Sequence, residues 1–567
     1  LSEEAAVPAW HAEMLPPLEL PVLVLTDEWR TFFPEAVGGT RRAVAEKLVR
    51  QLESEILPAY LSKQRWFSAK GETMDEARLG ERICWQHEGG SWLIGWVRVR
   101  AGGRSERYFM PLSLIWSEDD ERIRPLLSRA LAKVRQRQHP GLLCDALADE
   151  SFARALVRAM GAGESSSFGD GRLRFSSTSA FARLMRDAPD DWSARPPSAE
   201  GSNSALLVGE RLFLKVYRRL REGINPEIEM GRFLTDVSPV DNVAALAGVL
   251  EYEGDDGERI ALAVLQERVI AQGDAWSYTV DYLRRFAEEA LLESASAQIR
   301  EGQSRVDNPD TQARHDGYLS MMRTLGRRTG ELHCALSVTS GDPAFDPEPI
   351  TREDLRAWTG RTAEEAKLTF DKLERQLEGL PETARGQAER LLASRGALDR
   401  RIGSLAPARV QGAKTRYHGD YHLGQVLVAE NDFVIVDFEG EPARPLAERK
   451  AKSSALKDVA GMLRSFSYAA TTALREATAD RPDDVRVLRP LLHDWERAAR
   501  SAFEGAYAEA IAGCEAVPES AEERDALVAL FSLEKALYEL RYELDNRPEW
   551  ATIPLGGLLE LADAASA

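Results

Sequence analysis

The spacing of hydrophobic and polar positions changes near residue 280. Before that point, the runs SWLIGWVRVRAG and RYFMPLSLIW predict strands joined by a Gly-Gly turn, and residues 171–187 and 203–217 have similar strand-like patterning. After it, apolar residues recur at helical spacing almost to the end of the chain, interrupted by short strand-like runs within 425–437. Strands in the front half and helices in the back half predict an α+β fold in two lobes.

Three further segments carry weaker patterns. Residues 41–67 have helical periodicity, and we expect that helix to end near Pro58. Residues 120–160 are also expected to be helical. The first 40 residues are rich in proline and turn residues, which predicts a linker with one docking strand in the run ELPVLVL.

Composition excludes several classes of protein. The net charge of −19 and the scatter of basic residues argue against a nucleic-acid partner. No run of 18 apolar residues and no signal-peptide pattern occurs, so we expect no membrane partner. The four cysteines form no CxxC pair, which is typical of free thiols in a cytoplasmic protein. The chain begins with Leu, which suggests that it is a piece of a longer protein.

The stretch YHGDYHLGQVLV, residues 417–428, is the strongest candidate for chemistry. His418 and His422 are four residues apart, as in a helical metal site, but Gly419 lies between them and a hairpin pattern follows. A loop that leads into a strand is therefore expected, which disfavours a two-histidine metal site.

Phosphoryl transfer explains more of this stretch. It needs a carboxylate near the attacking hydroxyl, and further oxygen ligands that hold Mg²⁺ against the phosphates. Asp420 is the candidate for the first role. Gln425, five residues later, and Asp437, at the end of the strand in VIVDFEG, are the candidates for the second. The sequence therefore predicts a kinase-like catalytic loop with Asp420 as base and Gln425 and Asp437 on Mg²⁺.

A phosphate-binding lysine is expected upstream on a strand. Lys215 lies among apolar residues in RLFLKVYRR, where an ammonium group without an anion would be costly. Glu227 or Glu229, in the predicted helix that follows, could pair with it; we favour Glu227, but the helical face leaves the choice open. The other nucleotide-site candidates lie in a small polar loop before the first strand and in the run ALAVLQERVIAQGDAW, where a kinase hinge would offer backbone groups to adenine: Ser202, Asn203, Ser204 and Gln266.

HGDYHLGQVL and VDFEGEP together resemble the maltokinases, which are aminoglycoside-phosphotransferase-like kinases that use ATP and Mg²⁺ to make maltose 1-phosphate. LPAYLSKQRWFSAKG resembles their N-terminal cap motif, and QGDAW, LGRRTGELH, RPLAERKAKSSALKDVAGMLRSF and YELDNRPEWATIPLGGL follow in the expected order. The resemblance covers roughly residues 40–560. It implies a two-lobed fold like that of eukaryotic protein kinases, with an added N-terminal cap and a mostly helical C-lobe.

The resemblance also implies a domain plan and an acceptor site. The plan is a junction segment over 1–40, a cap over 41–135, a nucleotide-binding N-lobe over 136–268 and a helical C-lobe over 269–567. His418 would be structural. The junction resembles the region after a trehalose synthase domain, which implies a fused or complexed synthase and a role in α-glucan (glycogen) synthesis. The implied acceptor residues share one face of a C-terminal helix or follow it: Lys535, Tyr538, Glu539, Tyr542, Arg547 and Trp550.

Two alternatives remain open. The acceptor could be another sugar or amino sugar, such as glucosamine or an aminoglycoside. A cationic acceptor would need several carboxylates, whereas Lys535 and Arg547 argue for a neutral sugar. A chain without catalysis, such as a degenerate kinase or a sugar-binding module, is the other alternative, and the intact set of Lys215, Asp420, Gln425 and Asp437 argues against it.

Overall fold

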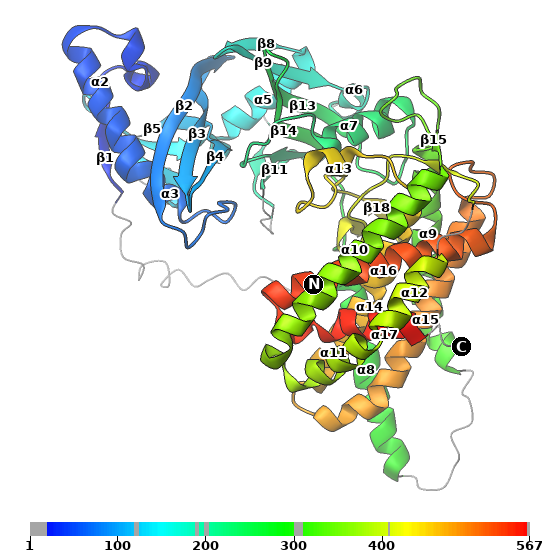
Figure 1. The fold of residues 1–567 in the computed structure, drawn as a ribbon. Helices are drawn as coiled ribbons and strands as arrows, with labels where there is room; N and C mark the ends of the chain where they lie inside the picture. The colour runs from blue at the N-terminus through cyan, green and yellow to red at the C-terminus, as the bar shows by residue number, and fades with distance from the viewer. Residues whose placement is uncertain are drawn as a thin grey trace. The chain divides into compact units, whose positions relative to one another are not determined.

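The structure, a computed structural model, describes residues 20–117, 124–186, 192–197, 203–299, 310–405 and 409–563. It divides into two compact units. Unit 1 consists of Leu1–Ile228 and Leu246–Arg268, and unit 2 of Glu229–Ala245 and Val269–Ala567. Each unit has its own core, so each is described by itself (Figure 1). None of the helices in the described ranges is long and apolar enough to cross a membrane.

The first sheet of unit 1 has the strand order β1-β6-β7-β5-β3-β2, with β4 paired to β3. The bounds of its strands are β1 (Val22–Val24), β2 (Met74–His87), β3 (Gly90–Ala101), β4 (Arg104–Phe109), β5 (Leu112–Trp116), β6 (Ala130–Gln136) and β7 (His139–Asp145). Helices α2 (Gly39–Gln51) and α3 (Leu57–Leu61) contribute to its core. The run ELPVLVL supplies β1, which pairs in parallel with β6. This sheet continues to Asp145, beyond residue 135, where we predict that the cap ends. That domain boundary stays a prediction.

Two local expectations about this region are wrong. Residues 130–145 form the hairpin β6–β7 instead of a helix, and the helix of this stretch, α5 (Glu150–Ala162), begins later. In β6 the burial alternates along AKVRQ, and Arg137 adopts a positive φ of 55° in the turn. The helical segment before the sheet also continues past Pro58, because a π-helical turn over Leu52–Ile56 precedes α3 and Pro58 lies in the first turn of α3, where a missing N–H costs little.

The second sheet of unit 1 has the order β10-β11-β12-β14-β13-β9-β8. Its strands are β8 (Ser165–Phe168), β9 (Gly171–Ser177), β10 (Ala194–Arg195), β11 (Ser204–Val208), β12 (Leu212–Val216), β13 (Leu246–Gly254) and β14 (Arg259–Glu267). Helix α5 packs on β9 and β13, and α6 (Ala180–Leu184) packs on β13. Every adjacent pair in this sheet is antiparallel, and β12 is paired on both sides, by β11 and β14. Lys215 on β12 is therefore held by backbone bonds on both sides.

Unit 2 is almost entirely helical, as the periodicity predicts. Its helices are α8 (Ala275–Ile299), α9 (Asp310–Ala335), α10 (Arg352–Gln376), α11 (Glu382–Ala393), α12 (Arg395–Leu405), α13 (Leu446–Lys450), α14 (Leu456–Thr478), α15 (Val485–Ala510), α16 (Ala521–Asn546) and α17 (Thr552–Asp563). Helix α16 packs against both α10 and α14 (Figure 1). The boundary between the units falls inside α7 (Pro226–Arg232).

A short hairpin interrupts the helices of unit 2. Strand β17 (Val426–Ala429) pairs with β18 (Asp432–Ile435), and Glu430 and Asn431 in the turn both have positive φ. Alternate residues of each strand are buried in the helical core. The strands β15 (Glu348–Pro349) and β16 (Ala413–Lys414) form a separate two-stranded sheet. The hairpin positions the segments on either side of it, which are residues 417–425 and 437–441.

Candidate active site

A buried carboxylate holds the loop at residues 417–423. Asp458, in the first turn of α14 and 2% exposed, accepts hydrogen bonds from the backbone N–H groups of His418 at 2.7 Å and Gly419 at 3.0 Å. Helix α14 also approaches closely, because a Cβ at Gly461 would lie 2.6 Å from the carbonyl oxygen of Tyr421. Contacts from helix α14 therefore fix the loop backbone. Sequence reasoning missed Asp458.

The histidines of the loop are used internally. His418 is 1% exposed; its Nε2 donates to the carbonyl oxygen of Val436 at 2.9 Å, and its Nδ1 accepts from the N–H of Asp420 at 3.3 Å. Nδ1 of His422 accepts from the N–H of Gly424 at 3.0 Å. Burial lowers the pKa of His422, and His418 and Lys535 add to this while Asp420 opposes it. Both ring nitrogens of His418 are occupied, which leaves none for a metal.

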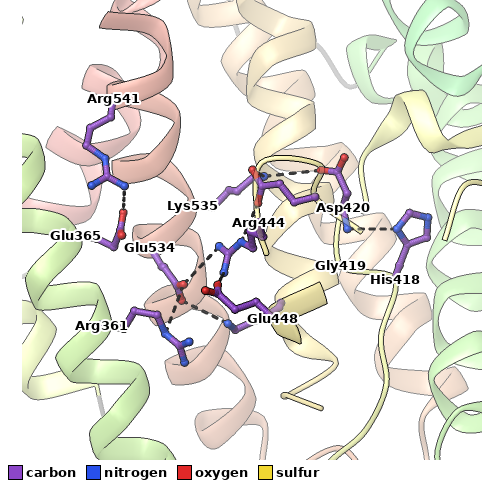
Figure 2. A network of polar contacts seen from close by, with 12 residues as sticks. Arg361, Glu365, His418, Gly419, Asp420, Arg444, Glu448, Glu534, Lys535 and Arg541 are labelled. Carbon is purple, nitrogen blue, oxygen red and sulfur yellow. Dashed lines mark hydrogen bonds and ion pairs between the residues drawn. The ribbon is translucent and has the colours of Figure 1, made fainter. Parts of the chain in front are cut away.

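Asp420, in the loop, faces a cation on helix α16. Lys535 Nζ on α16 lies 4.0 Å from Asp420 Oδ1 and 3.7 Å from Glu441 Oε1 (Figure 2). Burial would raise the pKa of Glu441, but Lys535, a hydrogen bond from Tyr538 and Arg444 together lower it. Glu441 is therefore held as a carboxylate, and the ammonium of Lys535 lies between two acids.

Gln425 and Asp437 lie at the same end of the hairpin. The N–H of Val436 donates to the carbonyl oxygen of Gln425 at 3.0 Å, directly beyond the Val426–Ile435 pair, so Asp437 follows the residue opposite Gln425. Asp437 has a positive φ of 65°, which is uncommon for a residue other than glycine and is a feature of functional sites. An amide oxygen and a carboxylate oxygen suit Mg²⁺, which takes oxygen ligands. These two residues fit the predicted metal role.

All six predicted acceptor residues and Asp420 line one cavity of about 830 Å³ in unit 2. Tyr542 is 46% exposed, while Glu539 is bound by the guanidinium of Arg464 through Nε at 3.0 Å and Nη2 at 2.8 Å. Arg547 is likewise bound by Glu543 at 2.8 and 3.0 Å. The structure thus brings the predicted set together, but it engages Glu539 and Arg547 in ion pairs that the sequence does not reveal.

Aromatic rings form part of the wall of this cavity. Lys535 Nζ lies 5.2 Å from the ring centre of Tyr538, and the Arg547 guanidinium lies 5.6 Å from that of Tyr542 and 5.1 Å from that of Trp550. Such contacts are attractive and orient both partners. The wall therefore combines flat apolar faces with fixed polar groups.

A charge network continues from the cavity into the helices, and sequence reasoning missed it. Glu534 on α16 lies within ion-pair distance of three cations, Arg361 at 4.0 Å, Arg444 at 3.8 Å and Lys457 at 3.7 Å (Figure 2). Burial lowers the pKa of Lys457, although Glu534 opposes this. The members come from segments far apart in the chain, so no local motif could have identified them.

The predicted nucleotide-side residues lie in unit 1. Lys215 Nζ lies 2.8 Å from Glu227 Oε2, and Glu227 also accepts from Tyr217 and, at 3.1 Å, from Gln266 Nε2. Glu229 instead accepts from Arg416 at 3.0 Å, within unit 2. Lys215 thus pairs with Glu227, the partner that we favour from the sequence.

The small polar loop is only partly described. Ser202 lies outside the described residues. Asn203 and Ser204 are described, and the Ser204 hydroxyl accepts from Arg218 Nε at 2.7 Å. Ala205 is the residue opposite Lys215, so Ser204 points to the other face of the sheet. The structure does not bring the Ser204 hydroxyl to Lys215.

Comparison with known proteins decides the family. Residues 193–491 match the phosphotransferase enzyme family, and residues 60–149 match the maltokinase N-terminal cap domain. The chain belongs to the phosphotransferase enzyme family. The family predicted from the loop and cap motifs is confirmed, whereas the predicted fusion with a trehalose synthase stays a prediction.

Several relatives of this phosphotransferase are named for glucosamine and not for maltose. A glucosamine kinase of Mycolicibacterium smegmatis is 26% identical over 65% of this chain and 79% of its own length. One of Streptacidiphilus jiangxiensis is 26% identical over 51% of this chain and 55% of its own length. A solved glucosamine kinase in complex with glucosamine, ADP and inorganic phosphate matches with a TM-score of 0.56 and 21% identity, over 86% of this chain and 93% of that one. The predicted kinase-like α+β fold with an added cap is confirmed.

Proposed function

We propose that this phosphotransferase transfers the γ-phosphoryl group of ATP to the anomeric hydroxyl of maltose and forms maltose 1-phosphate. One observation carries the proposal. The candidate base Asp420 and the six predicted acceptor residues line the same cavity of unit 2, whose volume of about 830 Å³ is at the upper end of the range for small-molecule sites. A disaccharide offers hydroxyls for its polar groups and ring faces for its aromatic wall.

The chemistry follows from the placement of Asp420. Its carboxylate accepts the proton of the acceptor hydroxyl as the oxygen–phosphorus bond forms and the bond from the γ-phosphorus to the bridging oxygen breaks, which releases ADP. Lys215, held by Glu227, would neutralise nucleotide phosphates. Gln425 and Asp437 would hold Mg²⁺, which supplies charge neutralisation at the phosphates.

The ion pairs among the lining residues favour a neutral acceptor. An amino sugar carries an ammonium group, which would need a carboxylate not already committed to another cation. The carboxylates of Glu539 and Glu543 are each bound by a guanidinium through two hydrogen bonds. Among the other lining carboxylates, Asp420, Glu441 and Glu534 lie within ion-pair distance of a cation, whereas Asp274 accepts from Ser277 and Asp458 from backbone N–H groups.

Glucosamine is the second candidate acceptor, because the relatives are named for it. An acceptor screen with ATP and Mg²⁺, read by product mass, separates the two. We expect kcat/KM for maltose to exceed that for glucosamine by about 10⁴-fold or more, the discrimination that unmatched buried polar groups give. A higher kcat/KM for glucosamine would overturn the maltose assignment, and no phosphorylated product from any sugar would overturn the kinase proposal.

The cellular setting is part of the same proposal. Maltose is a product of trehalose isomerisation, so a trehalose synthase, fused or associated, would supply the acceptor, and maltose 1-phosphate would feed α-glucan synthesis in the cytoplasm. Co-purification of a synthase with the tagged protein from its native cells would support the association. A synthase that is absent from the purified material would count against it.

A further inference from the structure

A second cavity, which we call the cap cavity, lies within unit 1 and has a volume of about 490 Å³. Its lining comes from the end of α3 and the residues after it, from residues 127–131, from residues 145–148 after β7, and from the start of β11. Ser204 and Arg218 belong to the wall, and Ser204 points away from the face that carries Lys215. Asn203 and Ser204, two of the predicted nucleotide-site residues, line this cavity, whereas Lys215, Glu227 and Gln266 do not.

The inner wall of the cap cavity is polar and rigid. Arg218, which is 2% exposed, donates through Nε to Ser204 and through Nη2 to the Asp145 carboxylate, and its guanidinium lies 5.0 Å from the ring centre of Trp66. The Tyr60 hydroxyl also donates to Asp145 at 3.3 Å. Burial and the Asp145 charge raise the pKa of Tyr60, so it remains a hydroxyl. The one acid of the wall is thereby neutralised by groups of the protein itself.

The remaining charges of the cap cavity are positive. Among the described residues that line it, the basic side chains are Lys63, Arg65, Arg129 and Arg218, and the acidic one is Asp145. The side chains of Lys63 and Arg65 are exposed and make no hydrogen bond or ion pair with any described residue. The chain as a whole has a net charge of −19, so this wall has the opposite sign, and a concave low-dielectric wall concentrates the field of its charges.

We propose that the cap cavity binds a small phosphate monoester, with the phosphate on Lys63, Arg65 and Arg129 and the organic body against Tyr60 and Trp66. Lysine and arginine are the usual partners of phosphate, and aromatic faces suit a sugar or similar ring. Asn203 and Ser204 at its edge continue into β11, which pairs with the strand of Lys215. The ligand would therefore act as an effector that binds next to the nucleotide-side strands without taking part in the transfer.

Calorimetric titration with glucose 1-phosphate tests this proposal. The protein is first saturated with a non-hydrolysable ATP analogue, which removes the nucleotide site from the measurement. Glucose serves as the neutral probe, and inorganic phosphate as the probe without an organic body. We compare the wild type, the double variant Lys63→Ala/Arg65→Ala and the control Lys47→Ala, which removes an exposed lysine of α2 outside the cavity.

We expect glucose 1-phosphate to bind the wild type and the control equally, with an affinity that falls as salt is added. The double variant should raise the dissociation constant about tenfold or more, with unchanged turnover in the absence of probe. Equal affinity for inorganic phosphate would support the site and identify the phosphate group alone as its ligand. The proposal is overturned if the wild type saturated with the ATP analogue binds no anion, or if the double variant binds as tightly as the control.

Discussion

The ion pair between Glu539 on α16 and Arg464 on α14 allows the proposed acceptor site to be tested by stability as well as by kinetics. The side chain of Arg464 is 5% exposed and that of Glu539 is 12% exposed, and two hydrogen bonds join them. Glu539→Ala would leave the guanidinium charged and without its partner in the core. Breaking a buried pair in this way costs about 3–5 kcal/mol, which corresponds to a fall in Tm of roughly 6–10 °C. The KM for maltose should rise as well, because Glu539 lines the cavity.

A double-variant cycle measured by calorimetry separates these effects. Replacing both partners, Glu539→Met with Arg464→Met, removes the unpaired charge and should recover most of the lost Tm while the KM for maltose stays high. Asp525→Ala, an exposed acid on the same helix, is the control and should change neither quantity. A Tm within roughly 2 °C of wild type for Glu539→Ala would refute the reasoning, because the ion pair would then contribute little to the stability of the fold.

Three further predictions address the loop, the metal and the pH dependence. Asp420→Asn should lower kcat by a factor of about 10²–10⁴ while ATP still binds, measured by steady-state kinetics and calorimetry; near-normal turnover would exclude it as the base. Asp437→Ala should raise the Mg²⁺ concentration needed for half-maximal activity, and an unchanged Mg²⁺ titration would make Asp437 structural. The pKa of Glu441 is lowered from 4.5, because Lys535 and its other partners outweigh burial. Its carboxylate therefore stabilises the fold above about pH 4.5, and this contribution is lost as pH falls. Glu441→Gln should flatten the acid side of the Tm–pH curve, and an unaltered curve would contradict the assignment.

Periodicity sufficed for the long elements of the fold and failed where tertiary context decides. The helices of unit 2 follow from apolar spacing alone, because each buries one face over many turns. The hairpin at residues 130–145 was missed because each of its strands has seven residues, and an apolar run of that length suits either a strand or a buried helix. The helical segment continues past Pro58 through a local π-helical turn, which no sequence pattern predicts.

The candidate site shows the same division. Residues that share one helix face, such as Lys535 and Tyr538, could be grouped from spacing, and a loop followed by a hairpin related Asp420 to Asp437. The partners that fix these groups could not be identified from the sequence. Asp458, Arg464 and Glu441 contact them in the folded chain although they are distant in the sequence. The grouping of these residues was therefore accessible from the sequence, while the partners that fix their charge and position were not; their roles stay predictions.

The distribution of candidates between the units has a kinetic consequence. Lys215, Glu227 and Gln266 form one hydrogen-bonded group in unit 1, whereas Asp420 and the acceptor residues belong to unit 2. The hydrogen bonds that join Lys215 and Gln266 to Glu227 lie within unit 1, and those that hold Glu539 and Arg547 lie within unit 2. Binding of nucleotide and binding of acceptor should then respond to separate sets of substitutions. Because five of the described carboxylates that line the acceptor cavity are already within ion-pair distance of cations, the selectivity for a neutral sugar would originate in these internal pairs as much as in the groups that contact the sugar.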